Sequence, residues 1–116
     1  MAYHDTQQYQ HLNTIAQLPP NWHPDANPIP GTVIQDTHTI LEALHVKGAP
    51  LPNVFPWVTG AIQLQYHEED RYLEVLLFPG GGREGYLKFG DQSEDDMDFT
   101  SINDAIRFLE RWQTQQ

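Results

Sequence analysis

The hydrophobic period changes to two at Ala61, and this feature constrains the fold more than any other in the chain. From residue 62 to 67, apolar and polar side chains alternate, which is typical of a strand with one buried and one exposed face. Residues 72–78 carry apolar side chains on both faces, so they predict a central strand. Three consecutive glycines then predict a turn before another strand at 86–89. Together these segments predict an antiparallel meander within residues 53–89.

The segments that flank this pattern add little to the expected sheet. Residues 53–58 are rich in strand-forming side chains, but Pro56 interrupts them and cannot donate a hydrogen bond to a neighbouring strand. This segment is therefore expected to be an edge strand or to stay unpaired. Residues 91–99 are mostly acidic and predict a solvent-exposed loop. The sheet is expected to have three or four strands.

A helix is predicted at residues 32–47, where apolar side chains recur at helical spacing. Thr32 begins a T-x-x-Q capping box, and Gly48 suits the C-terminal stop. The segment 19–31 before this helix is rich in proline, so it is expected to be an extended loop. Trp22 is expected to pin that loop to the core.

Two further helices are expected near the ends of the chain. Residues 1–18 show an approximately helical period, which two consecutive prolines end. Residues 100–113 carry a continuous apolar stripe that must pack on the sheet. Thr100 or Ser101 can cap the first turn of this last helix.

The expected order, α-α-β-β-β-α, gives an α+β fold of the two-layer sandwich type. In this arrangement the helices cover one face of a three- to four-stranded antiparallel meander. One domain, 1–116, is expected from the length. The other sheet face would be uncovered and would present Tyr72, Leu76 and Phe78 beside polar side chains. A half-apolar face is a candidate interface, and Trp57 near the edge strand is a further candidate for partner recognition.

The charge of the chain limits the kinds of partner it can bind. The net charge is −10, and residues 61–116 carry 12 acidic against 5 basic side chains. Such a surface repels nucleic acid and anionic lipid, so neither is expected as a partner, and it attracts a basic protein. The acidic residues expected to meet that protein are Asp91, Glu94, Asp95 and Asp96, which lie in the predicted loop.

The composition also suggests where the protein works. The sequence contains no cysteine, so disulfides and thiolate chemistry are excluded. The first ten residues are mostly polar and lack the layout of a signal peptide, and no apolar run has the length of a membrane span. A cytoplasmic protein is expected.

Two patterns that suggest bound ligands are incomplete. Residues 80–85 have the glycines of a phosphate-binding loop, but a strand rather than a helix is expected after them. His4 and His11, and likewise His38 and His45, are seven residues apart, which places them about two helical turns from each other. That spacing is too long for one metal ion.

The remaining candidates for chemistry are no stronger. The acidic run at 91–98 lacks the alternation and the central glycine of an EF-hand. Glu74 and Glu84 could in principle act as acid and base, but strands commonly place such residues in solvent. The sequence shows no nucleophile motif. We therefore expect no catalytic residue, no cofactor and no metal.

Several short motifs resemble a group of small acidic bacterial proteins with no established activity. They are Leu18-Pro19-Pro20-Asn21-Trp22, Pro28-Ile29-Pro30 before a helix, Pro52-Asn53-Val54-Phe55-Pro56, Gly60–Tyr66 and Tyr72–Val75. The likeness covers residues 18–90. These relatives usually read Asn-Trp-Asp-Gly-Tyr-Gly where this chain has Asn21-Trp22-His23-Pro24-Asp25-Ala26. Such proteins are often encoded among toxin–antitoxin or mobile-element genes, so the resemblance implies an inhibitory or adaptor role and assigns no catalytic residue.

Three functions follow as hypotheses. The first is a non-catalytic binding module, an antitoxin-like or immunity-like inhibitor or adaptor of a basic partner protein. The second is a small enzyme or ligand-binding domain that uses the exposed sheet face. The third is a structural protein that self-associates, for example as a homodimer, through its edge strand.

Overall fold

The computed structural model describes residues 2–19, 22–89 and 92–114. Its helices and strands are η1 (Tyr3–Asp5), α1 (Gln7–Ala16), α2 (Gly31–Val46), β1 (Asn53–Pro56), β2 (Ile62–Glu68), β3 (Arg71–Leu77), η2 (Pro79–Gly81), β4 (Arg83–Phe89), β5 (Gln92–Asp98) and α3 (Ile102–Thr114). No helix in these described ranges is long and apolar enough to cross a membrane.

The strands form one antiparallel sheet in the order β1-β2-β3-β4-β5. The predicted α+β class and the meander are confirmed, but the described sheet has five strands rather than three or four. The prediction of a loop at 91–99 was wrong, because residues 92–98 form β5. Acidic residues disfavour strands only weakly, and hydrogen bonding to the β4 backbone outweighs that preference at the edge of the sheet.

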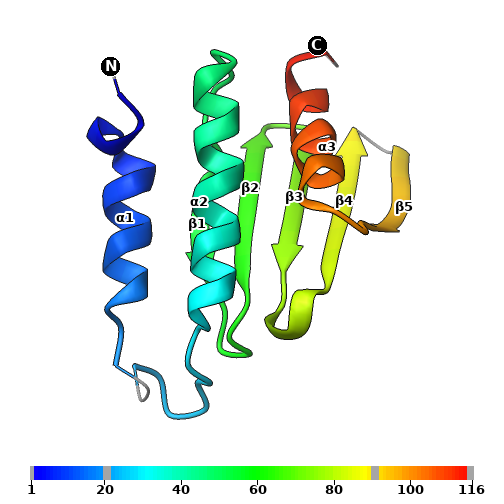
Figure 1. The fold of residues 1–116 in the computed structure, drawn as a ribbon. Helices are drawn as coiled ribbons and strands as arrows, with labels where there is room; N and C mark the ends of the chain where they lie inside the picture. The colour runs from blue at the N-terminus through cyan, green and yellow to red at the C-terminus, as the bar shows by residue number, and fades with distance from the viewer. Residues whose placement is uncertain (1, 20–21, 90–91, 115–116) are drawn as a thin grey trace.

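All three α-helices lie on one side of the sheet, as the sequence predicts (Figure 1). Helices α2 and α3 pack against the central strands, whereas α1 packs against α2 and the edge strand β1. The N-terminal segment is docked through Leu12 and Ile15, which are buried. The opposite side of the sheet has no helix over it in the described part of the chain (Figure 1).

The core lies between the sheet and the helices. On β2 and β3 every second side chain is buried there, as the period of two predicts. From α3, Leu109 and Trp112 are also buried, and the Trp112 ring stacks on Tyr66 with 5.2 Å between ring centroids. The expected packing of the last helix on the sheet is therefore confirmed.

The start of α2 differs from the prediction. The residue that precedes the helix is Pro30, and it provides no side-chain cap. Its carbonyl oxygen accepts hydrogen bonds from the backbone N–H groups of Val33 and Ile34. Thr32 is thus the second residue of the helix rather than its cap, so the predicted capping box was wrong. The ring of a proline fixes its φ angle and proline has no N–H to leave unpaired, so it suits the position just before a helix.

The other two helix-end predictions are confirmed. Gly48 has φ +74° after the last turn of α2, and the N–H of Ala49 reaches back to the carbonyl of Leu44. The Ser101 Oγ accepts a hydrogen bond from the backbone N–H of Asp104 and so caps α3. Trp22, in contrast, is only partly buried and does not belong to the described core. It lies beside His23 in the loop, with ring centroids 6.1 Å apart.

Candidate functional site

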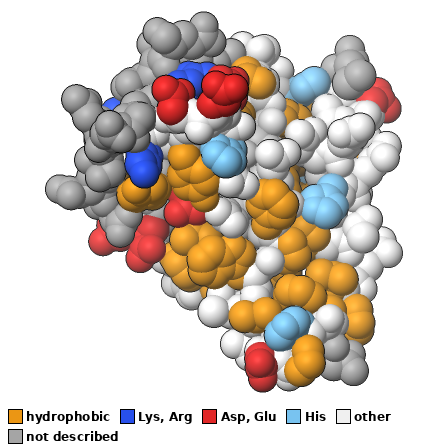
Figure 2. Space-filling view, turned by 180° about the vertical axis from the view of Figure 1, so that it is seen from behind, with side chains coloured by type: hydrophobic (Ala, Val, Ile, Leu, Met, Phe, Trp, Pro, Cys, Tyr) orange, Lys and Arg blue, Asp and Glu red, His pale blue; other side chains and the backbone are white. Residues whose placement is uncertain are grey.

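The side of the sheet that faces away from the helices is the candidate site, and we call it the open face. Strand register places its side chains in rows across the sheet. The rows are Phe55, Gln63, Leu76, Glu84 and Asp98; then Asn53, Gln65, Glu74 and Tyr86; then His67, Tyr72 and Lys88. Figure 2 shows this side, where hydrophobic side chains gather in a broad band and charged ones lie mainly around its margins.

The apolar residues predicted to bind a partner come together here. Tyr72 and Leu76 alternate with core residues along β3, and Phe78 follows them in the same alternation. Trp57 follows β1 and is 38% exposed. Phe55 is 42% exposed and joins them, although the sequence analysis missed it. Neighbouring residues of a strand point to opposite faces, so the burial of the apolar Val54 places Phe55 on the open face, and this alternation could have identified it.

The acidic residues predicted to bind a partner cannot be placed in the same way. Asp91 lies outside the described residues. Glu94, Asp95 and Asp96 belong to β5 by their backbone, and their side chains also lie outside the described part of the structure. That these four acidic residues bind a partner therefore stays a prediction.

A chain of hydrogen bonds fixes the middle of the open face. The Trp57 Nε1–H donates to Gln63 Oε1 at 3.0 Å. The Gln63 Nε2 donates to the Tyr72 hydroxyl at 2.8 Å and to Glu74 Oε2 at 2.5 Å. The Tyr72 hydroxyl in turn donates to the same Glu74 oxygen at 2.9 Å. Burial, together with this carboxylate, raises the pKa of Tyr72 well above its usual 10, so the phenol keeps its proton and the chain stays intact.

The charges on the open face are mainly negative. Glu74, Glu84 and Asp98 lie on it by register, against the single cation Lys88 among its described side chains. The arginines of the sheet are occupied elsewhere. Arg83 pairs with Asp36 on α2 at 3.2 Å, and Arg71 lies 4.0 Å from the centre of the Trp112 ring.

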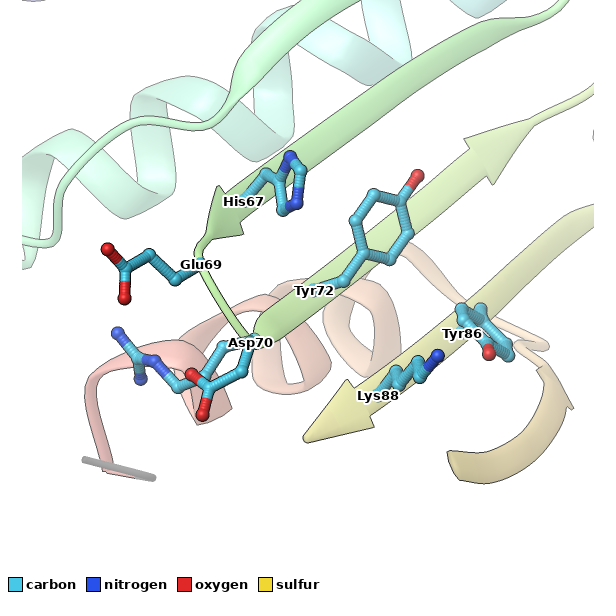
Figure 3. Close-up of a pocket in the computed structure, with 7 residues that line it drawn as sticks. His67, Glu69, Asp70, Tyr72, Tyr86 and Lys88 are labelled. Carbon is cyan, nitrogen blue, oxygen red and sulfur yellow. The ribbon is translucent and has the colours of Figure 1, made fainter. Parts of the chain in front are cut away.

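A shallow hollow of about 470 Å³ lies at the end of the open face near the turn between β2 and β3. Figure 3 shows three rings from adjacent strands around it: His67 from β2, Tyr72 from β3 and Tyr86 from β4. The Tyr72 ring lies 5.6 Å from that of His67 and 6.1 Å from that of Tyr86, measured between centroids. Two cations, Lys88 and Arg71, and two carboxylates, Glu69 and Asp70, also line the hollow.

The edge of the sheet at β1 offers few groups to a further strand. His11 on α1 contacts the Val54 carbonyl through its Nε2, at 2.9 Å. Pro52 and Pro56, two residues to either side, have no N–H to donate. One carbonyl of this edge is therefore taken and two N–H groups are missing, which leaves an added strand few hydrogen-bonding partners.

The structure also bears on the weaker candidates for chemistry. Among the side chains that the structure describes, no three His, Asp or Glu residues are placed to hold a metal ion. The glycine-rich segment turns the chain with positive φ angles at Gly80 and Gly81 and leads into β4. A strand, not a helix, follows the glycines, so the expected hairpin is present and a helix N-terminus for phosphate is not.

Comparison with known proteins finds no relative of this chain. No protein-family model, curated protein or solved structure matches the chain. The resemblance over residues 18–90 therefore stays a prediction, and the geometry of the open face is what bears on function.

Proposed function

We propose that the chain is a non-catalytic protein-binding module whose open face docks a basic partner protein. The observation that carries this proposal is the group of aromatic and aliphatic side chains on a sheet face that no described helix covers. Phe55 and Trp57 expose 42% and 38% of their surface there, beside Leu76. Apolar groups with a polar surround are typical of protein interfaces.

The charge of the chain supports a basic partner. The chain carries a net charge of −10. On the open face three described carboxylates stand against one lysine. A basic surface would be steered toward this face and would form its complex faster at low salt.

The β1 edge is a poor binding site, which favours the face of the sheet as the place where the partner binds. His11 and the flanking prolines protect that edge, which weighs against strand addition and against self-association through β1. In the antitoxin or immunity class that the resemblance implies, docking on the open face would block or recruit the basic partner.

Site-specific photo-cross-linking tests the proposal. A benzoylphenylalanine replaces Phe55 on the open face in one variant and Val46 in a control. Val46 is 78% exposed but lies on α2, on the other side of the molecule. Irradiation in the native cells should link a basic protein to position 55 and not to position 46. Cross-links only to a second copy of the chain, equal labelling at both positions, or none at position 55 would contradict the proposal.

The purified partner then allows a quantitative test. Phe55→Lys replaces an exposed aromatic side chain of the open face by a positive charge like that of the partner, and should weaken binding by about tenfold or more. Val46→Lys adds the same charge outside the open face and should change the Kd by less than about twofold. Equal effects of the two substitutions would show that net charge alone, rather than the open face, determines binding.

A further inference from the structure

We infer that the open face holds a recognition site for one arginine side chain of the partner, which pairs with Glu74 and packs against the exposed sides of the Tyr72 and Tyr86 rings. This inference rests on the proposed function, because the arginine belongs to the docked protein. It names the chemistry that would orient the complex on the sheet.

The first support is the state of the Glu74 carboxylate. The hydrogen bonds that it accepts from Gln63 and Tyr72 both converge on the Oε2 oxygen. Among the described ion pairs none involves Glu74, so its charge meets only neutral donors within the described chain. The side chain is half-buried, so water screens this charge less than it would screen that of a fully exposed glutamate. A cation brought by a partner would neutralise it.

The second support is the pair of aromatic rings beside this carboxylate. Tyr72 lies two residues before Glu74 on the same face of β3, and Tyr86 lies directly opposite Glu74 on β4. Their ring centroids are 6.1 Å apart with an angle of 57° between planes. The two tyrosines also line the hollow in Figure 3, so an incoming side chain can reach them.

These features favour arginine over lysine. A guanidinium group is planar, so it can stack on tyrosine rings while its N–H groups bond a carboxylate. An ammonium group is a compact charge that keeps its water more strongly. The hydrogen bonds from Gln63 and Tyr72 hold Glu74 in place before binding, which reduces the entropy lost on docking.

Lys88 provides an internal check on the sign of the ligand. It lines the same hollow and stands opposite Tyr72. Its charge opposes a cation and would assist an anion. Removing it with Lys88→Gln should therefore strengthen binding of an arginine side chain, whereas weaker binding would show that the hollow prefers anions and would overturn the inference.

A pair of short peptides tests the inference without the partner. The probe is acetyl-Gly-Arg-Gly-amide, and its control replaces arginine by citrulline, which has nearly the same shape but no charge. In amide NMR spectra of the full chain, the arginine peptide should shift residues 72–74 and 85–87, and the citrulline peptide should shift them at least about fivefold less at equal concentration. Equal shifts from the two peptides would overturn the inference.

Two variants that each remove one carboxylate separate a specific site from general attraction. Glu74→Gln removes the charge of the proposed site and should weaken arginine binding by about fivefold or more. Asp98→Asn removes the same charge from the same face but on β5, two strands away from Glu74, and should weaken it by less than about twofold. Equal losses would indicate attraction to the acidic surface alone. Dispersed amide spectra of both variants confirm that they are folded.

The outcomes of this test and of the cross-linking test are independent. Cross-links at position 55 together with no arginine selectivity would keep the docking face and refute the arginine site. Arginine selectivity that depends on Glu74, together with no cross-linked protein at position 55, would refute the proposed partner while leaving a cation site on the sheet.

Discussion

Gly85 offers the sharpest test of how α3 packs on the sheet. It is buried on β4, and a Cβ atom built there would lie 2.5 Å from Cζ of Phe99 and 2.9 Å from Cε2 of Phe108. Carbon atoms prefer separations of about 3.5–4.0 Å, so Gly85→Ala forces the Phe99 ring to retreat by about 1 Å. Such overpacking costs roughly 1–3 kcal/mol, and replacing a strand glycine returns about 0.5–1 kcal/mol. The free energy of unfolding should fall by about 1–2 kcal/mol.

Urea unfolding followed by tryptophan fluorescence and circular dichroism measures this change. Gly82→Ala is the matched control, because its Cβ would meet Phe78 at an ordinary 3.6 Å, and it should change stability by less than about 0.5 kcal/mol. Phe99→Leu shortens the side chain that the added methyl group of Gly85→Ala would meet. The double variant should therefore lose less stability than the sum of the two single variants. If Gly85→Ala is as stable as the original chain, the described packing of Phe99 and Phe108 on β4 is wrong.

Three further predictions concern the helices and pH. Ser101→Ala removes the α3 cap and should cost about 1 kcal/mol in urea unfolding, whereas Thr32→Ala should be within about 0.5 kcal/mol of the original chain because Thr32 caps nothing. Gly48→Ala forces alanine to a φ of +74° and should cost about 1 kcal/mol, and a neutral result would mean that α2 ends differently. Burial lowers the pKa of His38 below its usual 6.5, and its Nδ1 can accept the Tyr3 hydroxyl only when it carries no proton. The folded state therefore binds this proton more weakly than the unfolded state, so stability should fall as pH drops below about 6.5, and His38→Gln should reduce that dependence in unfolding curves measured at several pH values.

The candidate site could be predicted from the sequence only in part. The period of two placed Tyr72, Leu76 and Phe78 on one face of a strand without any knowledge of the fold. The contacts of Glu74 could not be predicted, because they depend on which residues of β2 and β4 stand beside it. A shift of one residue in strand register would turn Gln63 into the core and remove its bonds to Glu74.

The errors in the fold prediction have a similar origin. The acidic residues 92–98 have low strand propensity, yet they form β5 because β4 offers an unpaired row of backbone groups. Thr32 has the chemistry of a helix cap, yet Pro30 starts the helix two residues earlier. Local preference was outweighed in the first case by backbone pairing across the sheet and in the second by a neighbouring proline.

The sequence by itself determined the α+β class, the antiparallel meander and the apolar stripe of the last helix, because periodicity, prolines and glycines act through nearest neighbours along the chain. Only the tertiary structure decided that α1 packs against α2 and β1 and so helps to protect the β1 edge (Figure 1). It also decided that Glu74 lies beside Tyr72 and Tyr86 and takes part in none of the described ion pairs. These features depend on strand register and on packing between segments distant in sequence, which no local pattern specifies.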